Sequence, residues 1–143
     1  AHGTDAKEGA AAVEAIVEKC RRTGLVDDAS FARARSRSLA RRGASPRMIR
    51  ARLKAKGVDD DTAEEALAEL DAETEGDPEQ AAAVALARRR RLGPWRRDAA
   101  ERTARRERDL AALARAGFDL EVARSVIDAA STEALEEEAG RLP

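Results

Sequence analysis

The sequence predicts an all-α protein of tandem three-helix repeats, resembling helix-turn-helix units, stacked in an elongated, curved array. Aromatic residues make up only 2% of the 143 residues, so the core must consist mainly of Ala, Leu, Val and Ile, as in packed helices. Charged residues reach 38%, a share typical of thin helical assemblies with a large surface. The runs of β-branched and aromatic residues that strands need are missing.

Apolar periodicity and capping residues predict the N-terminal helices in order. The first covers residues 10–22, stops before Gly24 and places on one face Val13, Ile16, Val17 and Cys20. The second begins at Asp27 or Asp28, whose side chain caps it, and ends at Arg42 before Gly43. In the third, Ser45 is the cap, Pro46 takes the first helical position, and Gly57 follows the last turn.

The C-terminal half continues the pattern with four further helices. One begins in the run of aspartates at 59–61 with four apolar residues directed inward, Ala63, Ala66, Leu67 and Leu70. The next begins at Asp77 and ends near Leu92, and another runs from 93 to 116, with a break in it left open. A last full helix covers 120–130, and residues 131–143 are expected to form a short capped helix that frays.

An internal repeat divides these helices. The segment "GVDDDTAEEAL" at Gly57 resembles "GFDLEVARSVI" at Gly117, and "ARRGASPR" around Gly43 resembles "RRLGPWRR" around Gly93. We therefore expect an N-terminal segment with the last helix of an incomplete repeat (1–24), a second repeat (25–74), a third repeat (75–130) and an acidic C-terminal tail (131–143). Such arrays usually offer a partner a long surface rather than a catalytic pocket.

Charge is arranged in alternating blocks. Residues 31–56 contain ten bases and no acid, 59–79 eleven acids and no base, 88–108 ten arginines and three acids, and 119–138 seven acids and one arginine. Two interpretations stay open. The blocks are solvated helix faces that pair with each other in the fold, or one charged surface meets a polyanion and another meets a basic protein surface.

The arginines are the candidate binding residues. Arg33, Arg37 and Arg41 recur every four residues and form a stripe off the face predicted for Phe31, Ala34 and Leu39. The full candidate set for partner or DNA binding is Arg33, Arg37, Arg41, Arg42, Arg47, Arg50, Lys54, Arg88, Arg89, Arg102 and Arg105. The chain has one Gln and no Asn, so nucleic-acid binding is expected to be independent of sequence.

Other classes of function find little support. One Cys and one His exclude an intramolecular disulfide and a zinc cluster. No apolar run approaches a membrane span, no signal-peptide core is present, and no catalytic set, metal ligands or phosphate loop is found. The pair Asp27–Asp28 reads as a helix cap rather than catalytic carboxylates. We expect a cytoplasmic, non-enzymatic protein without cofactor, small-molecule substrate or membrane contact.

Apolar residues within these motifs are predicted to be core. They are Leu25, Val26, Phe31, Leu39, Met48, Ile49, Leu53, Val58 and Phe118. Trp95 follows Pro94 at a helix start, where a hydrophobic anchor is common, and a role at a partner surface is the alternative.

The segment from Gly24 to Leu67 resembles the central repeat of the RecX family of bacterial regulatory proteins. The matching residues are Leu25, Asp27, Asp28, Phe31, Ala32, Arg41, Arg42, Gly43, Pro46, Arg47, Ile49, Leu53, Lys56 and Gly57. Residues 110–128, which include Gly117 and Phe118, are similar to the end of the family's third repeat. The resemblance covers about 13–130, and the family motif is structural rather than a set of contact residues. Most of the family's first repeat has no counterpart here.

The resemblance implies a regulator of the RecA recombinase. Family members bind RecA, dock in the groove of its filament on single-stranded DNA, and inhibit its ATPase, strand exchange and SOS coprotease activities. The arginines would then face DNA phosphates and an acidic surface of RecA. Alternatives are a sequence-independent DNA-binding helical module that acts without RecA, a structural helical scaffold and, least favoured, an enzyme.

Overall fold

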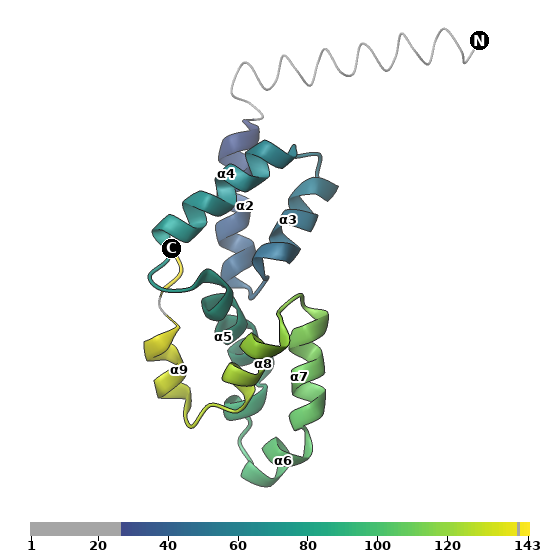
Figure 1. Cartoon of the computed structure of the whole chain (residues 1–143), viewed down its shortest axis with the longest axis vertical. Helices are drawn as coiled ribbons and strands as arrows, with labels where there is room; N and C mark the ends of the chain where they lie inside the picture. The colour runs from purple at the N-terminus through teal and green to yellow at the C-terminus, as the bar shows by residue number, and fades with distance from the viewer. Residues whose placement is uncertain (1–26, 140) are drawn as a thin grey trace, which may run out of the picture.

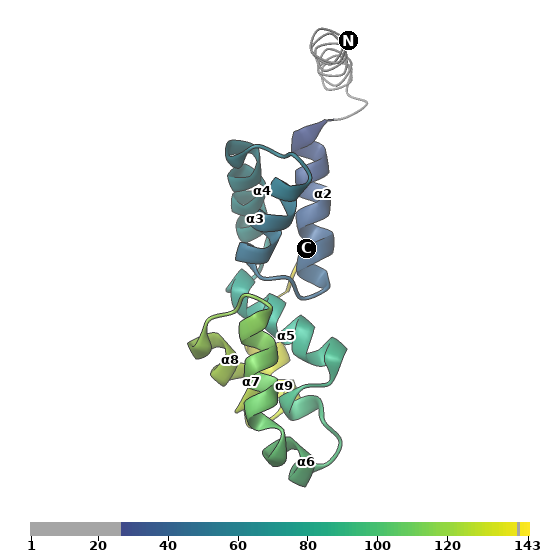
Figure 2. The same ribbon diagram turned by 90° about the vertical axis from the view of Figure 1, so that its right-hand side faces the viewer.

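The computed structural model describes residues 27–139 and 141–143, and all regular secondary structure among them is helical. The first bundle consists of α2 (Asp28–Arg41), α3 (Pro46–Ala55) and α4 (Asp60–Glu73). The second bundle consists of α5 (Pro78–Arg90), the 3-10 helix η1 (Gly93–Trp95), α6 (Ala99–Ala104), α7 (Arg106–Arg115), α8 (Leu120–Ile127) and α9 (Thr132–Glu138). The two bundles follow one another along the long axis (Figures 1 and 2). The all-α prediction is confirmed, and the helix predicted over 10–22 lies outside the described residues.

Capping side chains fix the helix starts. The Asp27 carboxylate accepts hydrogen bonds from the backbone N–H groups of Ala29 and Ser30 at 3.0 and 3.3 Å. Ser45 Oγ accepts from Met48 N–H at 3.1 Å, and Asp77 from Glu79 N–H at 3.0 Å. These bonds satisfy N–H groups that the first helical turn leaves unpaired. The predicted caps at Asp27, Ser45 and Asp77 are confirmed.

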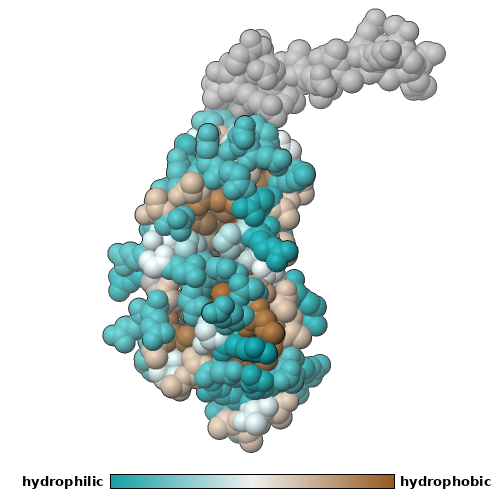
Figure 3. Space-filling model, viewed as in Figure 1, coloured by the Kyte–Doolittle hydropathy of each residue, from teal (hydrophilic) through white to brown (hydrophobic). Residues whose placement is uncertain are grey.

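Each bundle has its own hydrophobic cluster. The first is formed by Ala32, Leu39, Ala40, Ile49, Leu53, Val58, Ala63, Ala66 and Leu70. The second is larger and includes Ala82, Ala83, Leu86, Leu110, Leu113, Phe118, Val126, Ile127 and Leu135, with Trp95 packed against it. Figure 3 shows a mostly hydrophilic surface in which hydrophobic residues emerge at separate places over the two bundles. The exact repeat limits, 25–74 and 75–130, remain a prediction.

Phe31 departs from the prediction, because its side chain is 41% exposed rather than buried. The buried stripe of α2 runs through Ala32, Ser36, Leu39 and Ala40. At 100° per residue this register turns positions 31 and 34 away from the core, and Ala34 is exposed as well. Met48 is half-buried, while the core assignments of Leu39, Ile49, Leu53, Val58 and Phe118 are confirmed. Leu25 and Val26 lie outside the described residues.

The C-terminal segment is packed rather than frayed. Ser131 caps α9, and Leu135 and Ala139 are each 2% exposed within the second cluster. The predicted long helix over 93–116 is broken into η1, α6 and α7. The backbone is extended at Arg96 and Asp98, with ψ angles of 140° and 122°, which separates η1 from α6, and Arg105, with φ −103° and ψ 8°, separates α6 from α7.

Candidate anion-binding groove

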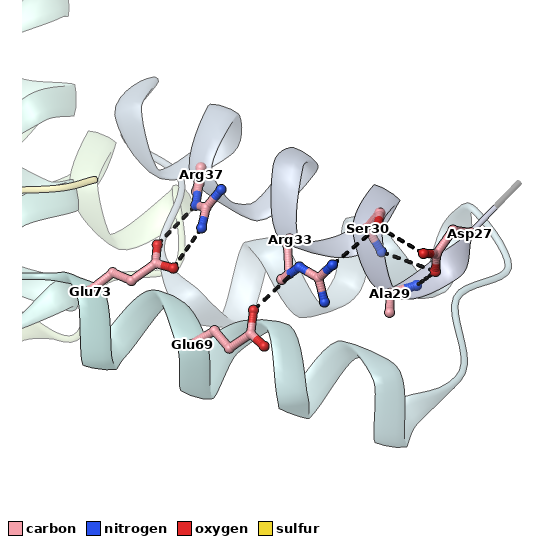
Figure 4. A network of polar contacts seen from close by, with 7 residues as sticks. All are labelled: Asp27, Ala29, Ser30, Arg33, Arg37, Glu69 and Glu73. Carbon is pink, nitrogen blue, oxygen red and sulfur yellow. Dashed lines mark hydrogen bonds and ion pairs between the residues drawn. The ribbon is translucent and has the colours of Figure 1, made fainter. Parts of the chain in front are cut away.

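Two arginines of the α2 stripe, Arg33 and Arg37, face acidic side chains of α4. Arg37 donates to the Glu73 carboxylate through Nε at 2.9 Å and Nη2 at 2.6 Å, and Arg33 Nε lies 3.5 Å from Glu69 Oε2 (Figure 4). Arg50 of α3 forms a similar pair with Glu64 of α4. The hydrogen bond from Arg37 lowers the pKa of Glu73, and that from Arg50 lowers the pKa of Glu64. The interpretation that charge blocks pair within the fold therefore holds for these three arginines.

The pairing follows from matched spacing. Arg33 and Arg37 are four residues apart, as are Glu69 and Glu73, so each pair forms one row on its own helix. When α2 packs against α4, the two rows meet. All four side chains are more than one third exposed, so these ion pairs add little to stability. Their main effect is to neutralise this face.

Four further candidate arginines also have partners within the chain. Arg102 Nη2 donates to the carbonyl oxygens of Ile127 and Ala129 at 2.8 and 2.6 Å, and so caps the C-terminal end of α8. Arg105 pairs with Glu101 at 3.4 Å, and Arg88 lies 3.8 Å from Glu136. Arg41 donates to the Pro143 carbonyl oxygen at 3.1 Å.

A groove of about 450 Å³ lies between the two bundles, and its charged lining residues are basic. Its lining among residues 27–139 and 141–143 includes six arginines and no acidic residue. Three come from the first bundle (Arg35, Arg42 and Arg52) and three from the second (Arg89, Arg90 and Arg115). Uncharged side chains complete the lining: Leu39, Ala44, Met48, Leu86, Ala112 and Ala116. Within the part of the chain that the structure describes, none of these six arginines forms a salt bridge.

Only two of the candidate residues, Arg42 and Arg89, line this groove. Arg35, Arg52, Arg90 and Arg115 were not in the candidate set. Arg35 and Arg42 are seven residues apart, and this spacing, which places two residues on one helix face, was the available signal. Nothing in the spacing indicates that Arg115 comes to lie opposite them. Arg47 and Lys54 are exposed outside the groove.

Close contact at Gly43 holds the bundles together beside this groove. Gly43 is buried with φ of +93°, and a Cβ atom there would overlap the Cα and Cβ atoms of Leu86 in α5. Ser45 Oγ donates to the Ala116 carbonyl oxygen at 3.3 Å, and Arg89 Nη1 to the Arg42 carbonyl oxygen at 3.3 Å. The turn between α2 and α3 is thus in direct contact with the second bundle, which sets the distance between the groove walls.

Substituting Gly43 by alanine is expected to destabilise the protein much more than the same change at Gly57. Gly57 has a similar φ of +85°, but a Cβ there meets nothing within 4 Å. The left-handed backbone alone costs about 1 kcal/mol, and at Gly43 the overlap with Leu86 adds about 2 kcal/mol. Urea unfolding of the two variants measures the difference, and equal losses would mean that the contact with α5 relaxes freely.

Comparison with known proteins agrees with this architecture. Residues 27–67, which comprise α2, α3 and most of α4, match the family model described as RecX, second three-helix domain. The chain is also 43% identical over 127 residues, 89% of its length, to the Regulatory protein RecX of Myxococcus xanthus. The chain belongs to the RecX family.

Two further RecX relatives are similar over most of the chain. The chain is 36% identical over 121 residues to the Regulatory protein RecX of Corynebacterium efficiens, and 37% identical over 118 residues to that of Mycolicibacterium vanbaalenii. These alignments cover 81% and 80% of the chain. They cover 66% of the Myxococcus protein, 57% of the Corynebacterium protein and 62% of the Mycolicibacterium protein, so the chain spans less than two thirds of these RecX relatives.

No solved structure matches this RecX family member at a significant level. Among the residues that the structure describes, no helix has the length and apolar character needed to cross a membrane.

Proposed function

We propose that this RecX family chain regulates the RecA recombinase without catalysis of its own. It binds the RecA filament on single-stranded DNA in the cytoplasm and inhibits ATP hydrolysis, strand exchange and SOS coprotease activity. Membership of the family supports a regulatory role. The observation that carries the proposal is the groove, whose six arginines lack acidic partners within the described residues.

The chemistry of the groove favours a polyanion as its ligand. A guanidinium group presents planar donors that match phosphate oxygens and keeps its charge at any relevant pH. Several such groups in one groove release condensed counterions from a nucleic acid, and this release supplies binding free energy. Among the described residues, the groove lining offers no Asn, Gln or acidic side chain to read bases, and its arginines match phosphate oxygens, so we expect binding to depend on the backbone of the strand rather than on its sequence.

Titration of RecA's DNA-dependent ATP hydrolysis with this chain tests the proposed regulation. We expect the rate of hydrolysis to fall as the chain is added, and a fall at substoichiometric amounts would indicate that filament growth is blocked. The chain should hydrolyse no ATP in the absence of RecA. An unchanged rate, with the chain shown to be folded by circular dichroism, would contradict the proposal.

The groove also supports a second candidate function, DNA binding without RecA. Because the arginines come from this chain alone, they are available to a free oligonucleotide. Fluorescence anisotropy with a labelled single strand measures this directly, and binding is expected to weaken steeply as salt is raised. Indifference to DNA at micromolar protein would contradict the second candidate and leave the groove to an acidic surface of RecA.

A further inference from the structure

The last residues of the chain return to the first bundle. We define the strap as residues 141–143, which follow α9 of the second bundle. Arg141 N–H donates to the Glu75 carbonyl oxygen at 3.1 Å, and Glu75 N–H donates to the Arg141 carbonyl oxygen at 3.0 Å. Leu142 packs against the first hydrophobic cluster, and Pro143 accepts the hydrogen bond from Arg41 of α2. Figures 1 and 2 both place the C-terminal end beside the first bundle.

The residues that precede the strap are packed in the second bundle. Leu135 and Ala139, just before it, are buried in the second cluster. A single segment is therefore fixed to both cores. The covalent connection between the bundles is the short linker 74–77, in which Gly76 has a φ of +92°. Beyond this linker, the relative orientation of the bundles depends on the contacts at Gly43 and on the strap.

The strap and the groove lie on opposite faces of α5. The groove is lined from α5 by Leu86, Arg89 and Arg90. A second hollow of about 510 Å³, beside the strap, is lined from α5 by Ala81, Val84, Ala85 and Arg88 and from the strap by Arg141 and Leu142. At 100° per residue, the centres of these two sets are about 150° apart around the helix. A rotation of α5 relative to the first bundle that opens one side therefore closes the other.

We propose that the strap is a latch that holds the anion-binding groove at its binding width, a regulatory role that rests on the proposed function of the groove. With the strap seated, the three arginines of each bundle face one another across the groove. Once the strap is released, the second bundle turns on the linker and the two sets of arginines move out of register. A ligand that spans both sets then loses the contacts of one bundle.

Replacing Leu142 by aspartate tests the latch, because a charge there cannot stay against the first cluster. Leu120→Asp is the matched control, since Leu120 is 49% exposed and lies outside the strap. Spin labels on cysteines replacing the exposed residues Glu65 and Arg108 report the distance between the bundles, with the single native cysteine, Cys20, changed to serine. We expect a broadened distance distribution and about tenfold weaker oligonucleotide binding for Leu142→Asp only.

A reversible cross-link supplies the opposite test. Glu75 and Arg141 exchange both backbone hydrogen bonds, and residues paired in this way have Cα atoms about 5.5 Å apart, a separation that a disulfide spans. Cysteines at 75 and 141 in the Cys20→Ser, Leu142→Asp chain should restore oligonucleotide binding when oxidised and not when reduced.

The spin-label distances and the oligonucleotide affinities test different parts of the proposal. An unchanged distance distribution in Leu142→Asp would refute the latch. A broadened distribution with parental oligonucleotide affinity would refute its control of the groove. A parent chain that binds no oligonucleotide would overturn the proposed DNA contact instead, and the spin-label distances would still decide whether the strap orients the bundles.

Discussion

Replacing Arg35, Arg52 and Arg115 together by glutamate is expected to weaken binding of a single-stranded oligonucleotide by at least about 100-fold and to remove inhibition of RecA. These three groove residues form no salt bridge among the described residues, so their replacement breaks no ion pair in the fold. They come from α2, α3 and α7, and the change reverses charge on both walls of the groove. Fluorescence anisotropy and RecA's ATP hydrolysis measure the two effects.

The matched control is Arg97, Arg108 and Arg124 to glutamate, which makes the same change in net charge at exposed positions outside the groove. This variant should bind nearly as the parent does. The dependence on salt adds a second readout. Six phosphate contacts on a single strand give a slope of about −4 for log affinity against log salt, and the groove variant should retain about half of it. Equal weakening by both variants would show that net charge, and not the groove, determines binding.

Replacing Asp109 by asparagine is expected to lower the free energy of unfolding by about 3 kcal/mol, because it removes the buried counter-charge of Arg96 and leaves, among the described residues, only Glu101, whose side chain is 49% exposed. Asp109 is 1% exposed and accepts hydrogen bonds from Gly93 N–H at 2.8 Å and from Arg96 Nε and Nη2 at 2.8 and 2.7 Å. This network fixes the turn between α5 and α6 to α7. In a chain of this size, the loss corresponds to a fall in Tm of roughly 10 °C.

Asp128→Asn is the control for this prediction. Asp128 accepts two hydrogen bonds from Arg106, at 2.7 and 2.8 Å, in the same bidentate geometry, but its side chain is 43% exposed. Exposed pairs of this kind contribute less than about 1 kcal/mol. Urea unfolding of the two variants isolates the effect of burial, and equal losses would mean that the Asp109 pair is no more important than a surface ion pair.

The same pair predicts a dependence on pH. Burial by itself raises the pKa of Asp109, but the hydrogen bonds from Arg96 and from Gly93 N–H outweigh it, so the pKa lies below its usual value. A carboxyl with a lowered pKa stabilises the fold above its unfolded value, near 4, and loses that contribution as pH falls through the folded value. The difference in unfolding free energy between parent and Asp109→Asn should therefore be largest near neutral pH and shrink in acid.

Much of the fold can be predicted from residues that act on their own helix ends. Helix starts were predictable because Asp27, Ser45 and Asp77 act on their own first turns, and the helix ends because glycine is favoured where φ is positive. Phe31 was misassigned because a one-residue change in register moves a side chain from the core to the surface, and only packing against α4 decides that register. The sequence gives no signal for the role of Asp109, because its partners at 93 and 96 lie across a turn whose path local patterns do not determine.

The site was harder to predict than the fold. Opposite charge blocks left two interpretations open. Pairing within the fold is confirmed in part, and contact of a charged surface with a polyanion or a basic protein stays a prediction. Arg33, Arg37 and Arg50 pair with α4, while the groove gathers six arginines that form no salt bridge within the described ranges. The pairing with α4 was visible as matched spacing of four residues. The groove was not, because Arg35 and Arg115 are brought together only by the way the second bundle packs on Gly43.

The pairing of α2 with α4 also bears on how a nearly neutral protein would attract a polyanion, as proposed for the groove. The formal net charge is −1 at pH 7, which on average opposes association with DNA. Folding, however, uses acids of α4 to cancel arginines on one face and leaves the groove arginines without an acidic partner among the described residues. The molecule therefore has a neutralised face where α2 meets α4 and a positively charged groove between the bundles. Its behaviour on an ion-exchange column and the proposed attraction to a nucleic acid need not agree, because the column responds to the whole surface and a strand bound as proposed responds to one groove.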